Sequence, residues 1–334
     1  MKKILFTILL FCVTYAQVKD EINYSPKISG YVRGIYNSDF ENSTFQLKHA
    51  RLSFKGFINE FTAYRFLLDV GRVGKLDVTQ EDGTIKQVDA KFTDLILDAY
   101  IAAQLTKNIS VKFGQYKIPF STSNLKSPYN VEFVNRPLIT KITPALGDVG
   151  VQFTYDFKKS LPLKFQAGVF NGEGPNTISN DNKYNMVARG VFSPIKNITF
   201  QANYYTGHIK GIQNTLFDFG LTAKYKNLTV ATEYVTRTQE YTNFDDKPDA
   251  YFVNAIYRIK CDSEIIKNIR PSIRFDSYNP DQLMATDKQN RITAGLTFEF
   301  VGKRFSELKI NFEKFNFDSK DDVEQIYLLY QIKF

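Results

Sequence analysis

Cysteine, histidine and tryptophan are almost missing from this 334-residue chain, which has two cysteines, two histidines and no tryptophan. Cys12 lies in an N-terminal apolar segment, so Cys261 has no partner for an internal disulfide and no cysteine-based metal site can form. His49 and His208 are too few for a histidine metal centre. We therefore predict that the protein has no cofactor and no metal.

Catalytic pairs are also scarce. Ser53 shares a strand face with His49, but nucleophilic catalysis needs the two held within hydrogen-bond reach, and a lone histidine on a polar strand face more often lines a channel. Asp94 and Asp98 lie four residues apart and are better placed to pair with arginines. No glycine-rich phosphate loop follows a strand and opens a helix. We predict that the protein is not an enzyme.

Long apolar runs are absent after the first sixteen residues. Lys2 and Lys3 precede the ten apolar residues Ile4–Val13, and small residues lead to Ala16. This pattern is typical of a secretory signal peptide, and the run is far shorter than the ~20 residues of a spanning helix. A lipoprotein signal ending at Cys12 is disfavoured by the bulky Phe11 before it. We expect a signal peptide at 1–16 and one domain at 17–334.

Positive charge exceeds negative charge in the whole chain, with a formal net charge of +8 that falls to +6 once Lys2 and Lys3 are removed. A basic protein often binds nucleic acid. Export argues against that partner, so we expect none. An exported chain without a helical span can still be integral to a membrane if its strands close into a barrel, because closure satisfies every backbone group.

What the chain has in abundance is alternation with period two. Between Arg291 and Phe300 one face is fully apolar and the other is polar or small. Most of these segments have the roughly 9–11 residues that a tilted strand needs to cross a bilayer. We count sixteen such segments, at 28–37, 45–57, 61–71, 92–104, 109–117, 148–157, 162–170, 184–193, 198–207, 217–225, 228–237, 250–259, 268–277, 290–300, 306–317 and 324–334.

Short and long connections alternate between these segments. Tight turns are expected near 59–60, 106–108, 160–161, 194–197, 226–227 and 302–303, and longer polar links at 72–91, 118–147, 171–183, 208–216, 238–249 and 278–289. Short turns on one rim and long loops on the other are typical of a bacterial outer-membrane barrel, as is a last strand ending in an aromatic residue, here Phe334. The 20 tyrosines and 30 phenylalanines can supply the interfacial girdles. The sequence predicts an all-β transmembrane antiparallel barrel of about sixteen strands in the bacterial outer membrane.

The polar face of the strands carries both signs of charge. Its cations are Arg33, Arg51, Lys55, Arg65, Lys112, Lys164, Arg189, Lys224, Arg237, Arg258, Arg270, Arg274, Arg291, Lys309 and Lys333. Its acids are Asp69, Asp94, Asp98, Asp156, Asp218, Glu233, Asp276, Glu299 and Glu313. Fifteen cations against nine acids leave an excess of six. The lumen either attracts anions, as rings of arginine and lysine do, or is lined by mutually neutralising ion pairs.

The link at 118–147 is the longest. A thirty-residue loop in a compact domain is usually functional, and we expect it to fold inward and narrow the pore. It offers Lys117, Lys126, Arg136 and Lys141 against Glu132. Folded outside the barrel, the same loop would instead make a binding surface. Lys48 lies on the apolar face of its strand, which requires a bulge or a position near the rim.

Several blocks of sequence resemble the phosphate-selective porin O and P family. They include Phe113–Ser121, Glu132–Arg136 with Pro144 and Asp148–Gln152, Ala167–Gly174 and, more weakly, Leu47–Leu52 and Asp98–Tyr100. The resemblance covers most of 28–205. It implies a sixteen-stranded porin that is a homotrimer in a membrane of lipids and lipopolysaccharide, with a path lined by arginine and lysine that guides phosphate or other small anions.

These observations lead to one functional hypothesis and one rival. The hypothesis is a porin for passive diffusion of small hydrophilic solutes with a preference for anions such as phosphate. The rival is a structural or adhesive barrel that acts through its surface loops. The candidate residues of the anion path are Arg33, Arg51, Arg65, Lys112, Lys117, Arg136, Lys141, Arg189, Arg258, Arg274 and Arg291.

Overall fold

The wall of the molecule is a single antiparallel sheet. A computed structural model describes residues 23–72, 75–79, 85–89, 92–144, 147–157, 161–179, 182–209, 211–241, 245–280, 288–302, 305–319 and 321–334. The signal peptide expected at 1–16 lies outside the described residues. Sixteen strands form the wall: β1 (Lys27–Ser38), β2 (Ser43–Asn59), β3 (Thr62–Asp69), β6 (Ile96–Gln104), β7 (Ile109–Tyr116), β8 (Asp148–Asp156), β9 (Leu163–Phe170), β10 (Asn185–Ile195), β11 (Ile198–Ile209), β12 (Ile212–Tyr225), β13 (Leu228–Glu240), β15 (Asp249–Tyr257), β17 (Ile266–Asn279), β18 (Gln289–Phe300), β19 (Ser306–Phe317) and β20 (Val323–Lys333).

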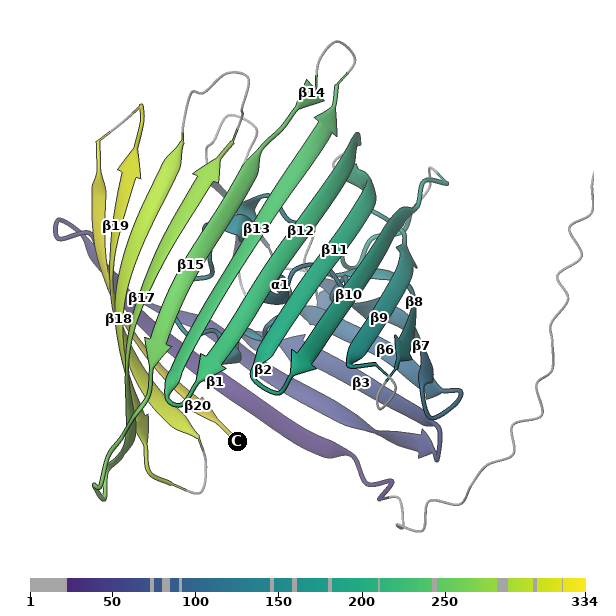
Figure 1. The fold of residues 1–334 in the computed structure, drawn as a ribbon, viewed down its shortest axis with the longest axis horizontal. Coiled ribbons are helices and arrows are strands. Elements are labelled where there is room, and N and C mark those ends of the chain that lie inside the picture. Colours follow the sequence, from purple (N-terminus) through teal and green to yellow (C-terminus); the bar gives the residue numbers. More distant parts are fainter. Residues whose placement is uncertain are drawn as a thin grey trace, which may run out of the picture.

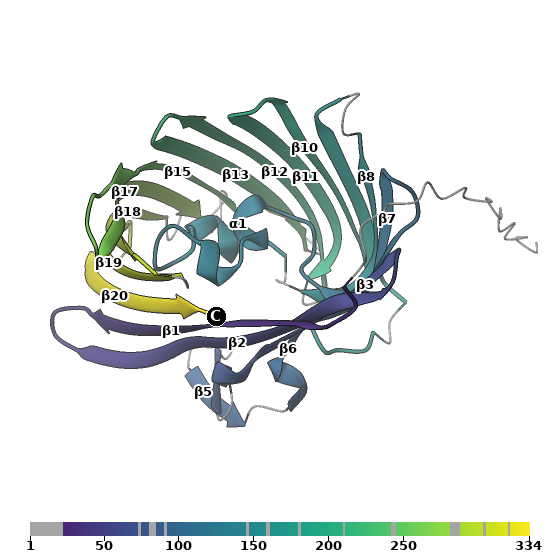
Figure 2. The same cartoon turned by 90° about the horizontal axis from the view of Figure 1, so that it is seen from below.

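The sheet closes on itself. Each strand pairs with its neighbour in the chain, and β1 also pairs with β20 in the register Tyr31↔Lys333 to Ser38↔Ile326. Two-residue pieces, β14 (Asp245–Asp246) and β16 (Ile259–Lys260), extend the edges of β13 and β17. Figure 1 shows the tilted strands from the side, and Figure 2 shows the ring that they form. The predicted closed barrel of about sixteen strands is confirmed.

The two faces of the strands differ as alternation requires. Phe219, Val253 and Ile292 are exposed on the outer face, whereas Asp218, Asn254 and Arg291 are buried on the inner face. A surface of exposed apolar and aromatic side chains suits hydrocarbon, and closure leaves no strand edge unpaired. The period-two pattern therefore corresponds to a lipid-facing apolar side and an inward-facing polar side of each strand.

One predicted connection is wrong. The long link expected at 208–216 is a tight turn, because β11 continues to Ile209 and β12 begins at Ile212. Gly211 has φ of +80°, which suits a tight turn. Polar residues such as His208 and Gln213 extend the strands instead of leaving them, since they pair across the hairpin.

Two features depart from a regular barrel: a hairpin outside the wall and a β-bulge between β1 and β2. The link expected at 72–91 holds a separate hairpin of β4 (Lys75–Thr79) and β5 (Ile85–Asp89) between two short 3-10 turns, η1 (Val70–Arg72) and η2 (Phe92–Leu95), and it lies outside the wall (Figure 2). The register of β1 with β2 shifts between Arg33 and Gly34, so Lys48 has no direct partner. This bulge turns Lys48 inward despite its place in the sequence pattern.

The interior is not empty. Between β7 and β8 the chain enters the barrel as the inner loop, residues 117–144, which holds α1 (Thr122–Leu125), η3 (Pro128–Asn130) and η4 (Leu138–Lys141). Figure 2 shows α1 surrounded by strands. The inward folding expected for this loop is therefore observed. Among the described residues, no helix is long and apolar enough to cross a membrane.

Candidate functional site

An apolar patch attaches the inner loop to one side of the barrel. Ile118, Phe120, Ile139 and Ile142 of the loop are buried in a cluster with inner-wall residues of β10–β15: Val187, Tyr205, Leu216, Val235, Ala250 and Phe252. Four such loop side chains, each fully buried, contribute about 1.5–3 kcal/mol apiece. The polar inner face of these strands is thus interrupted where the loop packs.

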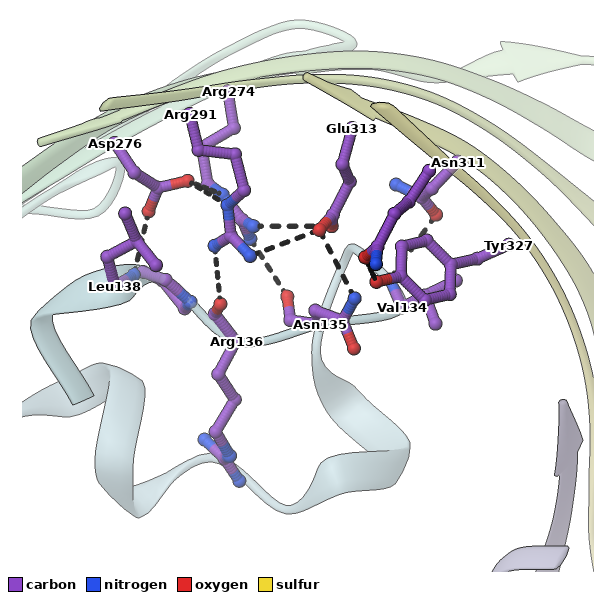
Figure 3. A network of polar contacts seen from close by, with 12 residues as sticks. Val134, Asn135, Arg136, Leu138, Arg274, Asp276, Arg291, Asn311, Glu313 and Tyr327 are labelled. Atoms are coloured by element: carbon purple, nitrogen blue, oxygen red, sulfur yellow. Dashed lines mark hydrogen bonds and ion pairs between the residues drawn. The ribbon is translucent and has the colours of Figure 1, made fainter. Parts of the chain in front are cut away.

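Polar contacts fix the loop to β17, β18 and β19 (Figure 3). Arg274 and Arg291 both bind the carboxylate of Asp276, with Nε–Oδ2 distances of 2.7 and 3.0 Å. The Nη1 atom of Arg291 also lies 3.2 Å from Glu313 Oε2. All four side chains are almost completely buried, so the charges compensate one another inside the protein.

The same residues hold the backbone of the loop. Leu138 N–H donates to Asp276 Oδ1 at 3.0 Å, Arg274 donates to the carbonyl of Asn135 at 3.0 Å, and Arg291 donates to the carbonyl of Arg136 at 2.7 Å (Figure 3). A loop segment without sheet partners needs such donors and acceptors when it is buried. Arg274 and Arg291 therefore position the loop, and they have no open surface toward solvent.

A second carboxylate binds the start of α1. Glu233 on β13 accepts hydrogen bonds from Thr122 N–H at 2.9 Å, Ser123 N–H at 3.2 Å and the Ser123 hydroxyl at 2.5 Å. Arg189 donates to the Thr122 hydroxyl at 2.7 Å and to Asn203 Oδ1 at 2.6 Å. Arg189 is buried too, which makes it a further residue that supports the loop.

Two cations of the loop itself are turned into its own backbone. Lys117 Nζ donates to the carbonyls of Asn124 at 2.8 Å and Lys126 at 2.8 Å, and Arg136 also donates to the carbonyl of Lys126. Burial, together with the neighbouring cations Arg136 and Arg51, lowers the pKa of Lys117 to about 7. For the same main reason the pKa of Arg136 falls to about 10, which leaves it charged at neutral pH.

Open space remains on the opposite side of the loop, along β1, β2, β3 and β6. A cavity of about 820 Å³ is lined there by Lys27, Arg51, Lys55, Arg65 and Lys333, and no carboxylate is among its described lining residues. A second cavity of about 210 Å³ shares Arg51 and Arg65 with the first and adds Lys112, Lys117 and Asp98. Together the lining holds seven cations and one carboxylate, which lies 3.3 Å from Arg65.

Three of these cations form a row across adjacent strands. Lys27 of β1 pairs directly with Lys55 of β2, and Lys55 pairs directly with Arg65 of β3. Directly opposite residues of an antiparallel sheet have Cβ atoms about 4.5–5.5 Å apart, and like charges at that spacing destabilise the sheet. Such a row raises the local potential and attracts anions.

The remaining candidate residues lie elsewhere. Arg33 is buried on the inner face of β1, with 1% of its surface exposed, and Arg258 is exposed between β15 and β16 at the short-turn rim. Lys141 contacts Gln289 and lies 5.1 Å from the ring of Tyr278. The structure thus brings Arg51, Arg65, Lys112 and Lys117 together at the open cavities and places the others outside their lining.

Some contributors were missed by the sequence analysis. Lys27 lines the larger cavity, yet it precedes the first residue of the predicted strand by one position. Glu307 is buried on the inner wall and binds Lys309 at 2.8 Å and Arg270. It shares the alternation of Lys309 and Glu313, so the pattern contained the signal. Lys48, turned inward by the bulge, donates to Asn135 of the loop at 2.7 Å.

A scan of protein families identifies the chain by its sequence. The model of the phosphate-selective porin O and P family matches residues 29–215, which is more than half of the chain. The chain belongs to this family. It is an outer-membrane porin of bacteria, and its family and fold are those of a channel. A comparison with curated protein sequences gave no match.

Solved structures share the fold at low sequence identity. The anion-selective porin from Comamonas acidovorans is similar with a TM-score of 0.64 and 10% identity, covering 93% of this chain and 99% of that one. The outer membrane protein OmpT of Vibrio cholerae is similar with a TM-score of 0.64 and 10% identity, covering 94% of this chain and 100% of that one. OmpF of Salmonella typhi is similar with a TM-score of 0.59 and 14% identity, covering 92% of this chain and 97% of that one. These likenesses agree on the barrel.

Proposed function

We propose that this porin is a passive channel for small hydrophilic solutes that favours anions, phosphate among them. The observation that carries the proposal is the cavity of about 820 Å³ with five cations and no carboxylate among its described lining residues. Fixed positive charge in a low-dielectric wall concentrates anions, while several weak sites in series allow release. The Comamonas acidovorans porin that shares the fold is anion-selective, which supports the same sign of selectivity here.

The inward position of the inner loop favours a channel over the adhesive barrel. Ile139 and Phe120 of the loop are buried inside the wall, so the longest loop packs within the barrel instead of projecting from it. It narrows the lumen instead and leaves the residual space beside the basic strands. We also propose, from the family likeness, a homotrimer in a membrane that contains lipopolysaccharide; the mass of the detergent-solubilised protein tests that assembly.

Planar bilayer recording tests the selectivity. Purified protein in a KCl gradient should give a reversal potential of the sign that marks chloride as the more permeant ion, and added phosphate should reduce the chloride current. A preference for potassium would overturn the anion proposal, and the absence of conductance would overturn the channel proposal. The variant Lys314→Glu is a matched control, because Lys314 already pairs with exposed Glu324 outside the cavities.

A further inference from the structure

An apolar hollow on the lipid-facing wall lies outside the channel. It measures about 530 Å³ and lies over β10, β11, β12 and β13, with Leu163 at the start of β9 beside them. Gly190 and Ala202, which pair directly across β10 and β11, form its floor. Larger side chains surround them: Leu163, Phe192, Phe200, Phe219, Leu221 and Tyr234. Gly190 has no atom within 4 Å of where a Cβ would lie, so the depression is open above it.

Charge lies at one end of this hollow. Two short turns join the four strands, one between β10 and β11 and one between β12 and β13, and each carries an exposed lysine, Lys196 and Lys226. Phe200 is four residues from Lys196, and Leu221 is five residues from Lys226. At about 3.4 Å per residue, the lysines lie about 15 Å from the hollow. In Figure 1 these strands lie side by side with their short turns at the lower edge.

That spacing matches one leaflet. The hydrocarbon core of a bilayer is about 30 Å thick, so a lipid whose phosphate is at the surface reaches about 15 Å inward with its acyl chain. Lysines near a membrane surface attract anionic headgroups, at about 1 kcal/mol for each residue. An acyl chain fills an apolar groove and hides the surface that Gly190 and Ala202 leave uncovered.

We propose that the hollow binds one anionic phospholipid, with an acyl chain over Gly190 and Ala202 and the phosphate between Lys196 and Lys226. The charge complementarity of the turns favours this occupant over a second copy of the chain, which in the same membrane would bring its own turn lysines to the same depth, with like charges close together. The site is independent of the lumen, so its test does not depend on the proposed anion preference.

Native mass spectrometry of the detergent-solubilised protein tests the proposal with added phosphatidylglycerol or phosphatidylethanolamine. One phosphatidylglycerol should be retained at concentrations where phosphatidylethanolamine is not. Gly190→Leu places a side chain in the hollow, where an added Cβ meets no atom within 4 Å, and should weaken that retention about tenfold. Gly34→Leu is the matched control, because Gly34 on β1 also has open space beside its Cα and lies outside the hollow. Lys196→Glu with Lys226→Glu should remove the preference for the anionic lipid, whereas Lys260→Glu at the same rim should not.

Three outcomes would overturn the assignment. Equal retention of the two lipids would remove the role of the lysines. Equal effects of Gly190→Leu and Gly34→Leu would show that lipid binds the wall without using the hollow. A change of oligomeric mass in Gly190→Leu alone would show that a second copy of the chain covers the hollow. Both glycine variants should first show the heat-modifiable migration of a folded barrel, which confirms that the comparison is between folded proteins.

Discussion

The two sides of the lumen use arginine for different purposes. Along β17, β18 and β19 the cations Lys267, Arg270, Arg274, Arg291 and Lys309 form ion pairs with Asp276, Glu299, Glu307 and Glu313. The inner loop makes hydrogen bonds to five of these residues, Arg274, Asp276, Arg291, Lys309 and Glu313. Along β1, β2 and β3, Lys27 and Lys55 line a cavity with no carboxylate among its described lining residues, while Arg51 pairs with buried Asp69 and Arg65 with Asp98. Neutralised charge fixes the loop, and the excess of cations on the other side is where we propose that anions pass. The ion-pair interpretation of a mixed-charge lumen therefore fits the first side, and the anion-attracting interpretation remains our proposal for the second.

The largest expected effect comes from breaking the neutralised side. Asp276→Asn would leave Arg274 and Arg291 buried with one carboxylate fewer and weaken the contact to Leu138 N–H. Removing one partner of a buried ion pair typically costs about 3–5 kcal/mol. Urea unfolding in detergent should show a loss of that size. The control Glu324→Gln breaks an exposed pair with Lys314 and should cost at most about 1 kcal/mol. Equal losses would contradict the role of the buried ion pairs in holding this side together.

A smaller effect is expected where α1 is held. Glu233→Gln keeps the shape of the side chain but turns an amide N–H₂ toward the donors of Ser123. Hydrogen bonds to a charged group contribute about 1.5–3 kcal/mol, so the loop should loosen while the wall persists. Single-channel recording should show added current fluctuations, and limited proteolysis should cut within 117–144. A quiet, protease-resistant variant would show that the apolar patch alone fixes the loop.

The anion preference that we propose should depend on the other side of the lumen, along β1, β2 and β3. Lys27→Glu with Lys55→Glu reverses two charges of the row and should lower the chloride-to-potassium permeability ratio about tenfold, which corresponds to roughly 1.4 kcal/mol. The reversal potential in a KCl gradient measures it. Lys314→Glu changes the same kind of charge away from the cavities and serves as the control. An unchanged ratio in the double variant would place the path elsewhere.

The smallest effect concerns pH. The pKa of Lys117 is lowered to about 7, so this side chain is charged below pH 7 and increasingly neutral above it. Anion preference should therefore decline by about twofold between pH 6 and pH 8, since one of seven lining cations is lost. Lys117→Met should give a ratio that does not change over this range. A pH dependence that persists in Lys117→Met would assign the titration to another group.

The barrel could be predicted because the alternation within each strand shows which of its faces is apolar and which is polar. Ile292 and its neighbours alternate whether or not the partner strand is known, and the turns around Asn227 interrupt the pattern locally. The burial of Arg274 beneath the inner loop could not be predicted in this way. Its pairing with Asp276, two residues away on the same strand face, follows the alternation, but its cover by Asn135 depends on a loop 139 positions away in the sequence, and such a contact leaves no periodic trace. Arg51 and Arg274 look alike in the sequence and each pairs with an acid, but Arg51 lines the two open cavities whereas Arg274 is bound to the loop.

The separation between Leu138 and Asp276, or between Val131 and Lys309, also orders events in time. The loop leaves the ribosome and the export machinery well before the strands that hold it. Its second half cannot reach its final place until β17, β18 and β19 have joined the sheet, because the hydrogen-bond partners of Val131, Asn135, Arg136 and Leu138 lie there, whereas α1 is held by β10 and β13. Contacts this distant along a chain form slowly. Closure of the barrel and docking of the inner loop are therefore both late steps of biogenesis. A chain arrested before the last strands would present an unpaired strand edge and an undocked inner loop.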